Sequence, residues 1–207
     1  MSRSRIRVDK AFLAVSVVLI VAGFFIFSSA SLGLLAKESS NYSSVAFSQT
    51  VFGLFLGTVG MVIATKIDFK FWKTTAFYLF VLAIILNILV LFPNIGHAHG
   101  GARRWLMIGN ISFQPSELLK LSFITYFAAW AASKKEKMAT FTWGFLPLLV
   151  LLGLCGALLL KQPDTDTFSL IVITGLAMFV AGGGRWRYVF MVVLAGVIGV
   201  AFLAYTR

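Results

Sequence analysis

Long uncharged segments recur along this chain of 207 residues, separated by charged residues at nearly regular intervals. Six uncharged runs are 18 to 29 residues long, and a seventh, between Lys120 and Lys134, has only 13. A helix needs about 20 mostly apolar residues to cross the hydrocarbon core of a bilayer. The pattern therefore predicts a polytopic, all-α membrane protein and excludes an ordinary soluble domain.

The composition points the same way, with 59% hydrophobic and 12% charged residues against about 45–50% and about 25% in soluble domains. The short run becomes long enough to span if its helix begins at Pro115 and includes Glu117 and Lys120. We therefore expect residues 1–207 to form one transmembrane helical domain with about seven spans. The expected spans are residues 11–33, 46–65, 74–92, 115–133, 141–160, 167–184 and 188–205.

Basic residues are distributed unequally between the two sides that these spans define. Twelve Lys and Arg residues fall on the side of the amino terminus and five on the other. Cytoplasmic loops are enriched in Lys and Arg, so the amino terminus is predicted to be cytoplasmic and the carboxyl terminus extracytoplasmic. Cations spaced by membrane thickness also argue against a nucleic-acid partner, which requires a basic patch on one exposed face.

The first apolar segment could instead be a secretory signal peptide, because residues 28–31 (SSAS) are small enough for a cleavage site. The apolar region of a signal peptide is about 7–15 residues long, whereas this segment is uncharged for 26 residues. We therefore expect an uncleaved first span.

Glu117 and Lys120 are ionisable residues within an expected span, which makes them functional candidates. Three residues apart on a helix, they can form an ion pair. Pro115 suits the first helical position, and a carboxylate in the first turn complements the positive helix end. A purely structural ion pair that fixes the packing of this helix remains an alternative.

The loop before that helix carries Arg103, Arg104 and Trp105 after two glycines, on the predicted extracytoplasmic side. Two arginines on this disfavoured side need a local anion or a carboxylate partner. The guanidinium fork binds phosphate oxygens in a bidentate manner, and Trp suits the membrane interface. The loop is therefore a candidate site for a lipid-linked phosphate or diphosphate. Alternatively, both arginines reach ordinary lipid phosphates.

A second predicted outer loop contains Lys161, Gln162, Asp164 and Asp166. Pro163 is expected to end one helix, and Asp164 can cap the next. Asn87, within the third expected span, is predicted to form a hydrogen bond with a neighbouring helix.

Metal and cofactor signals are weak. His97 and His99 form an HxH pattern without a third nearby ligand, so a solvated polar loop is expected there. Cys155, the single cysteine, is expected to be a packing residue. No cofactor is predicted, and a divalent cation has no support in the sequence.

Short motifs at the ends of the expected spans form a specific set, above all GARRW followed by QPSE and a lysine. The set resembles the shape, elongation, division and sporulation family, the FtsW/RodA/SpoVE proteins, over essentially the whole chain. Residues 123–135 are more similar to FtsW than to RodA. The matching positions are residues 28–31 (SSAS), Gln49, residues 67–69 (IDF), 101–105 (GARRW) and 114–117 (QPSE), Lys120, residues 162–164 (QPD) and Thr167.

The resemblance implies a peptidoglycan glycosyltransferase of the bacterial inner membrane that polymerises the undecaprenyl-diphosphate-linked precursor, lipid II, in cell division or shape maintenance. It implies a class B penicillin-binding protein and other divisome or elongasome membrane proteins as partners. The implied substrate-binding residues are Arg103, Arg104, Trp105, Glu117 and Lys120, with Gln114, Ser116, Gln162 and Asp164 as secondary candidates.

The family's catalytic aspartate lies in a large outer loop after the seventh span. The sequence ends at Arg207, where that loop would begin, so we expect roughly the amino-terminal half of a ten-span protein without the catalytic residue. Asp166 stands where the family usually has Gly, which predicts a change in local packing. Two other functions remain open, namely a flippase or transporter for lipid-linked precursors and a non-catalytic membrane scaffold of the divisome.

Overall fold

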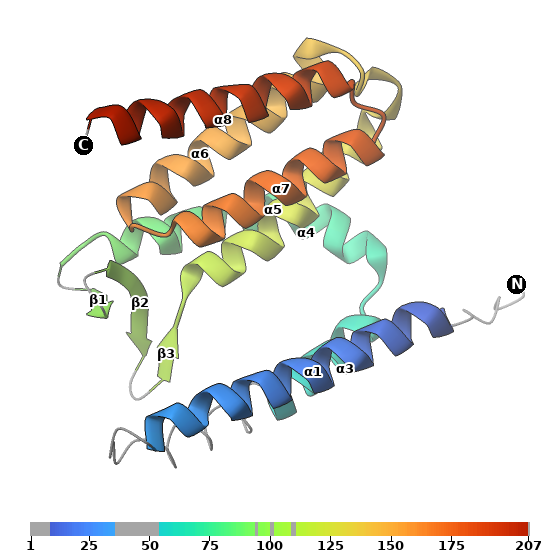
Figure 1. The fold of residues 1–207 in the computed structure, drawn as a ribbon. Coiled ribbons are helices and arrows are strands. Elements are labelled where there is room, and N and C mark those ends of the chain that lie inside the picture. The colour runs from blue at the N-terminus through green and yellow to red at the C-terminus, as the bar shows by residue number, and fades with distance from the viewer. Residues whose placement is uncertain (1–8, 36–53, 94, 100–101, 109–110, 207) are drawn as a thin grey trace, which may run out of the picture. The chain divides into compact units, whose positions relative to one another are not determined.

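The computed structural model describes residues 9–35, 54–93, 95–99, 102–108 and 111–206. The chain divides into two compact units, residues 1–68 and 69–207, and each is described by itself. The element order within the described ranges is given by the labels in Figure 1.

The amino-terminal unit contains helices α1 (Lys10–Leu35) and α3 (Leu56–Lys66). Asp9 begins α1, because its Oδ1 accepts hydrogen bonds from the backbone N–H groups of Ala11 and Phe12 at 2.9 and 3.1 Å. These bonds satisfy donors that a helix start leaves unpaired. The expected first span coincides with α1, whereas the first eight residues of the second, 46–53, lie outside the described ranges.

The carboxy-terminal unit contains five long helices. Helix α5 packs against α4, α6 and α7, and α6 also packs against α7. These helices follow the limits of the remaining expected spans within a few residues, with a π-helical turn, Phe141–Phe145, leading into α6. They are α4 (Phe69–Val90), α5 (Pro115–Ser133), α6 (Leu146–Lys161), α7 (Thr165–Ala181) and α8 (Trp186–Thr206).

Three segments of the described chain are long and apolar enough to cross a membrane by length and composition: Lys10–Ser29, Phe69–Val90 and Phe141–Lys161. Helices α7 and α8 supply shorter apolar stretches. Large apolar side chains on α7 and α8, such as Ile173 and Phe190, point outward and are more than 60% exposed. Such a surface is suited to lipid rather than water.

The core of this unit lies between α5, α6 and α7. Phe123 and Phe127 of α5 are fully buried, and Phe123 approaches α7 at Gly175. A Cβ at position 175 would lie 2.9 Å from the Phe123 ring and 3.1 Å from Leu148. The glycine therefore allows close packing of helices, as small residues do in membrane bundles.

A three-stranded antiparallel sheet forms the connection between α4 and α5 in this otherwise helical fold. Its strands are β1 (Gly96–His99), β2 (Ala102–Ile108) and β3 (Ile111–Phe113), in that order. The connection between α4 and α5 was expected to be an irregular loop. Strand β2 packs against both α4 and α5, so the sheet covers one end of the bundle (Figure 1). Pairing between the strands satisfies part of the backbone hydrogen bonding of this long connection.

The pairing of β1 with β2 contains a bulge. His97 pairs with Trp105 and Ala98 pairs with Arg103, so Arg104 is the extra residue of β2. A bulge interrupts the alternation of faces and redirects a side chain. The two neighbouring arginines consequently have different surroundings, since Arg103 is exposed and Arg104 is half-buried.

We predict that Gly96→Ala lowers the stability of the protein by about 1–3 kcal/mol, the usual cost of overpacking. A Cβ at position 96 would overlap the backbone carbonyl oxygen of Val90 at the end of α4, which cannot move without displacing the helix. Thermal unfolding in detergent measures the effect. Gly153→Ala in α6 is the control, because a Cβ there meets no atom within 4 Å and alanine favours the helix. Equal melting temperatures for the two variants would contradict the prediction.

Candidate functional site

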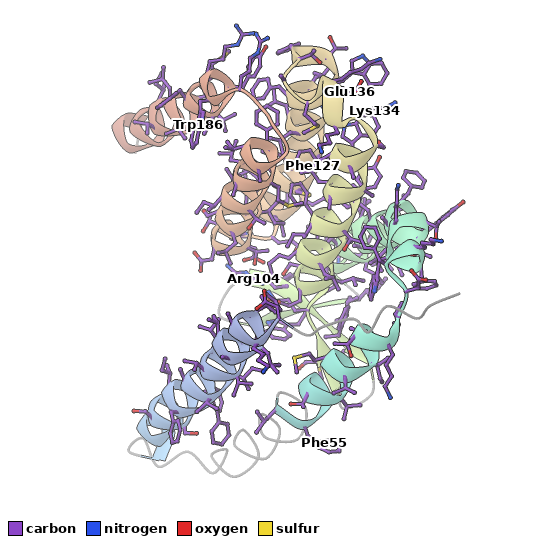
Figure 2. The ribbon with its side chains drawn as sticks, turned by 90° about the vertical axis from the view of Figure 1, so that its right-hand side faces the viewer. Phe55, Arg104, Phe127, Lys134, Glu136 and Trp186 are labelled. Atoms are coloured by element: carbon purple, nitrogen blue, oxygen red, sulfur yellow. The ribbon has the colours of Figure 1, made fainter. Side chains whose placement is uncertain are left out.

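The candidate residues gather at the end of the carboxy-terminal unit that carries the sheet. The amino terminus of α5, the last turn of α4, strand β2 and the turn between α6 and α7 meet there. Arg104 lies at this end and Lys134 at the opposite end of α5 (Figure 2). Two residues that the sequence predicts on opposite sides of the membrane therefore lie at opposite ends of α5.

Arg104 is directed toward the turn between α6 and α7. Its Nε donates to the carbonyl oxygen of Gln162 at 3.4 Å, and its Nη2 donates to the carbonyl oxygen of Pro163. Its Nη1 lies 3.9 Å from Oδ1 of Asp164, whose side chain is only 3% exposed. The expected carboxylate partner is therefore confirmed for Arg104, and the guanidinium fastens β2 to this turn.

Asn87 links three segments in the same region. Its Nδ2 donates to the carbonyl oxygens of Ala83 at 2.8 Å and Pro115 at 3.1 Å. Gln162 Nε2 donates in turn to the backbone oxygen of Asn87 at 3.0 Å and to its Oδ1 at 3.3 Å. The predicted hydrogen bond between Asn87 and another helix is confirmed. We call Asn87, Arg104, Gln162 and Asp164 the buried polar cluster.

Asp164 also performs the predicted capping. It is the N-cap of α7, and its Oδ1 accepts a hydrogen bond from the backbone N–H of Thr167 at 3.4 Å. Asp166 is exposed in the first turn of α7, so the substitution of the usual family glycine places no side chain in the core.

Three buried oxygens of the site have no hydrogen-bond partner among the described residues: Ser116 Oγ, Gln162 Oε1 and Asp164 Oδ2. Buried polar atoms are nearly always paired in proteins. All three belong to the start of α5 or to the turn between α6 and α7, where the resemblance placed secondary site residues. These atoms offer acceptors to a hydroxyl, amide or water.

Glu117 and Lys120 form the predicted ion pair in the first turns of α5. Lys120 Nζ lies 2.8 Å from Oε2 and 2.9 Å from Oε1 of Glu117. Gln114 is the N-cap and Pro115 follows it, as the sequence indicated. The side chain of Glu117 is 58% exposed and that of Lys120 is 27% exposed. Lys120 also borders a narrow cleft of about 40 Å³ between α5 and α7.

Arg103 and Trp105 lie on β2 beside Arg104 but outside the buried polar cluster. Arg103 is exposed and forms no ion pair with any described residue, and Trp105 is half-buried. The histidines of the HxH pattern lie in β1, and their side chains fall outside the described ones. No group of three or more His, Cys, Asp or Glu residues suited to a metal occurs in the described part of the chain.

The candidates thus divide into two groups. Arg104, Gln162 and Asp164 form bonds between segments distant in sequence, whereas Arg103 and Glu117 are exposed. The half-buried Lys120 pairs only with Glu117 of its own helix among the described residues. Sequence reasoning did not foresee that Asn87 joins the site. The available signal was the amide side chain of Asn87 within an otherwise apolar expected span.

Comparison with known proteins matches residues 9–207 to the family FTSW_RODA_SPOVE, described as "Cell cycle protein". Three relatives are each described as a probable peptidoglycan glycosyltransferase FtsW. Those from Burkholderia thailandensis, Geobacter sp. (strain M18) and Saccharophagus degradans are 35%, 31% and 35% identical over 84%, 96% and 96% of this chain. The alignments span 38%, 54% and 51% of the relatives, so the chain covers about half of their length.

Solved structures share the fold. Thermus thermophilus RodA, the rod shape determining protein, gives a TM-score of 0.69 at 25% identity, covering 91% of this chain and 58% of that chain. A structure described as "Structural coordination of polymerization and crosslinking by a peptidoglycan synthase complex" gives 0.67 at 26% identity, covering 92% and 53%. With its apolar helices, the chain is a polytopic helical membrane protein.

We predict that Arg104→Ala and Asp164→Ala each lower stability by about 1–3 kcal/mol, because each leaves buried polar groups without a partner. Together the two substitutions are expected to cost less than the sum, with a coupling of about 0.5–3 kcal/mol. Thermal unfolding of the four proteins in one detergent gives the cycle. Arg103→Ala is the matched control, and we expect a change within about 0.5 kcal/mol for this exposed residue. Additive losses, or an equal loss in the control, would refute the pairing.

Proposed function

Because the chain belongs to the FtsW/RodA/SpoVE family, we propose that it takes part in glycosyl transfer during peptidoglycan synthesis. The relatives described as peptidoglycan glycosyltransferases are about twice as long as this chain, so the activity is proposed for the complete protein. The observation that carries the proposal is the Glu117–Lys120 ion pair at the start of α5 together with the exposed Arg103 on β2, beside the buried polar cluster.

The proposed donor substrate is a polyisoprenyl-diphosphate-linked saccharide of the lipid II class. Arg103 would bind the diphosphate, with Trp105 at the depth of the headgroups and Lys120 as a second cation oriented by Glu117. Arg guanidinium and Lys ammonium are both suited to phosphate oxygens. The exposure of Arg103 and the ion pair of the half-buried Lys120 with Glu117 support this assignment, and the substrate's lipid chain would lie along the apolar helices.

In the proposed reaction, a sugar hydroxyl of one saccharide attacks the anomeric carbon of the other, and the bond to the diphosphate breaks. Negative charge develops on the leaving diphosphate, and cations fixed in position stabilise that charge. The proton of the hydroxyl passes to a base, a role that we assign to no residue of this chain. Arg104, Gln162 and Asp164 act as positioning residues, because they hold β2 to the turn between α6 and α7 and, through Asn87, connect this turn to α4 and α5.

The proposed orientation places the sheet end of the bundle outside the cytoplasm. Lys134, Lys135, Lys137, Arg185 and Arg187 lie in the connections at the other end, which supports this assignment. The proposed location is the bacterial inner membrane. The proposed partner is a class B penicillin-binding protein with other divisome or elongasome proteins, and the likeness to a complex of polymerization and crosslinking supports it.

A lipid flippase is the second candidate, and it requires polar residues that continue through the bundle. The buried polar side chains of the described residues are Asn87, Ser116, Ser122, Gln162, Asp164 and Thr167. They belong to the last turn of α4, the first half of α5 and the turn into α7, all toward the sheet end. This distribution favours a site at one membrane surface over a pathway across the membrane.

We predict that Lys120→Ala in the full-length protein lowers the rate of lipid II polymerisation about 10–100-fold, because one cation opposite the leaving diphosphate is lost. Arg103→Ala is expected to have a similar effect, and Lys120→Arg to recover part of the rate. Gel analysis of the glycan product measures it. The control is Lys161→Ala, which removes an exposed cation at the same end of the bundle. Polymerisation by Lys120→Ala within twofold of the unmodified protein would contradict the assignment.

A liposome assay with a fluorescent lipid-linked precursor separates the two functions. The polymerase proposal expects the same translocation rate with Lys120→Ala as with the unmodified protein. Translocation that depends on this chain and is lost with Lys120→Ala would support the flippase instead.

A further inference from the structure

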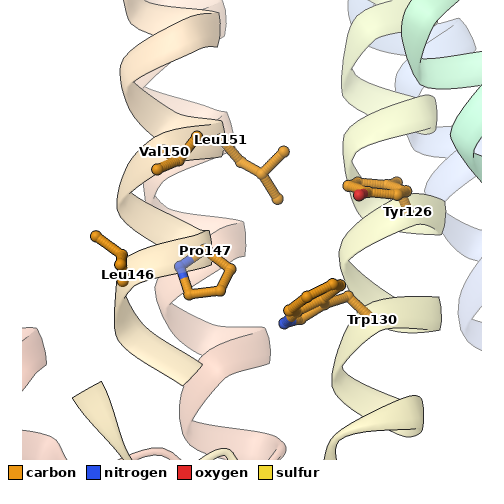
Figure 3. A pocket seen from close by; sticks show the side chains of 6 residues that line it. All are labelled: Tyr126, Trp130, Leu146, Pro147, Val150 and Leu151. Carbon is orange, nitrogen blue, oxygen red and sulfur yellow. The ribbon is translucent and has the colours of Figure 1, made fainter. Parts of the chain in front are cut away.

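An apolar pocket of about 270 Å³ lies between α5 and α6, near the end of α5 that is remote from the buried polar cluster (Figure 3). One wall comes from α5 and carries two aromatic rings, and the other comes from the first turns of α6. The lining residues are Tyr126, Trp130, Leu146, Pro147, Val150 and Leu151. Leu146 and Val150 are 40% and 60% exposed, so the pocket opens sideways from the bundle.

Contacts with neighbouring residues fix the aromatic wall. Trp130 Nε1 donates to the carbonyl oxygen of Trp143 at 3.0 Å, and the two indoles stack with centroids 6.3 Å apart. Tyr126 stacks on Phe80 of α4 at 5.4 Å between centroids. The indole N–H of Trp130 therefore already has a hydrogen-bond partner within the protein, and the pocket presents the apolar faces of rings that neighbouring residues hold in place.

Two lysines lie against the indole rings of Trp130, which lines the pocket, and of its neighbour Trp143. Lys134 Nζ lies 4.7 Å from the ring centroid of Trp143 and 5.9 Å from that of Trp130. Lys137 Nζ lies 5.5 Å from the Trp143 centroid. Figure 2 shows Lys134 and Glu136 together at this end of α5. Among the residues that the structure describes, neither lysine has a carboxylate within ion-pair distance, and Lys135 adds a third ammonium to the turn.

We propose that an anionic glycerophospholipid binds here, with one acyl chain in the pocket and its phosphate at Lys134 and Lys137. The α6 side of the lining belongs to a segment that is apolar enough to span the membrane, and the α5 side presents aromatic rings, so the occupant at that depth must be apolar. The turn above it carries three lysines and one glutamate, so the headgroup must be anionic. Basic pockets between membrane helices and aromatic residues at the interface both suit such lipids.

This site is separate from the proposed diphosphate site, which lies at the other end of α5 (Figure 2). With the orientation proposed above, it belongs to the cytoplasmic leaflet. A lipid held there would contact both the end of α5 and the start of α6 and so add to the contacts between these two helices. Binding is therefore expected to raise the melting temperature of the protein.

Native mass spectrometry of the full-length protein in detergent tests the proposal, with dioleoyl phosphatidylglycerol and dioleoyl phosphatidylcholine added separately. We expect the unmodified protein to retain the anionic lipid about tenfold more strongly, in line with the attraction of several lysines near a membrane surface. The triple variant Lys134→Gln, Lys135→Gln, Lys137→Gln is expected to reduce this preference to about twofold or less. A rise in melting temperature with phosphatidylglycerol is expected only for the unmodified protein.

Two controls make the result specific. Lys66→Gln, Lys70→Gln, Lys73→Gln removes the same charge from another basic segment and is expected to keep the preference. Val150→Trp fills the pocket and is expected to abolish retention, whereas Ile173→Trp, at a similarly exposed position on α7, is expected to preserve it. Melting temperatures of the variants without added lipid show whether they are folded.

Three outcomes would overturn the proposal. The first is an unchanged preference in the Lys134, Lys135 and Lys137 variant. The second is an equal loss in the Lys66, Lys70 and Lys73 control, which would indicate general surface charge. The third is full retention by folded Val150→Trp, which would show that the pocket holds no acyl chain. If the pocket instead held an acidic protein segment, Val150→Trp would displace that segment and leave lipid retention unchanged, which is this third result.

Discussion

The hydrogen bonds of Asn87 determine how the sheet end of the bundle is assembled. In apolar surroundings an unpaired amide is costly, so its groups must find partners within the protein. Asn87 meets this requirement by bonding the first residue of α5, Pro115, and by accepting from Gln162. Three segments distant in sequence are thereby fixed to one another. The exposed charges of Arg103, Glu117 and Lys120 depend on this arrangement for their positions.

Local features of the site could be read from the sequence. The Glu117–Lys120 pair, the start of α5 at Pro115 and the cap by Asp164 all involve residues at most three positions apart. Helix geometry alone brings such groups together, so residue spacing is sufficient to predict them. The limits of α1 and α8 likewise lie within two residues of the ends of uncharged runs, which are a property of the chain rather than of tertiary packing.

The sheet and the role of Arg104 could not be read in this way. Arg104 bonds residues nearly sixty positions later in the chain, and only the bulge in β2 separates its surroundings from those of Arg103. Two adjacent arginines have the same sequence signal for phosphate binding, yet one is fastened internally. Motif spacing singled out two segments that contact each other, Gln162–Asp164 and Arg103–Arg104, but the pairing between them depends on how α4 through α7 pack.

Helix α5 explains why two different sites can share one small bundle. Its middle is apolar on nearly every side and packs against α4, α6 and α7, so polar chemistry is confined to its two ends. At the sheet end, Lys120 is oriented by a carboxylate on the same helix. At the other end, Lys134 has aromatic rings beside it and no carboxylate among the described residues.

A cation oriented by a carboxylate is suited to holding a reacting phosphate in a defined place. A cation over an indole is suited to a mobile lipid headgroup, because ring faces attract charge without fixing its direction. The difference between the two ends is therefore consistent with the two proposals, a diphosphate at the sheet end and a membrane lipid at the other.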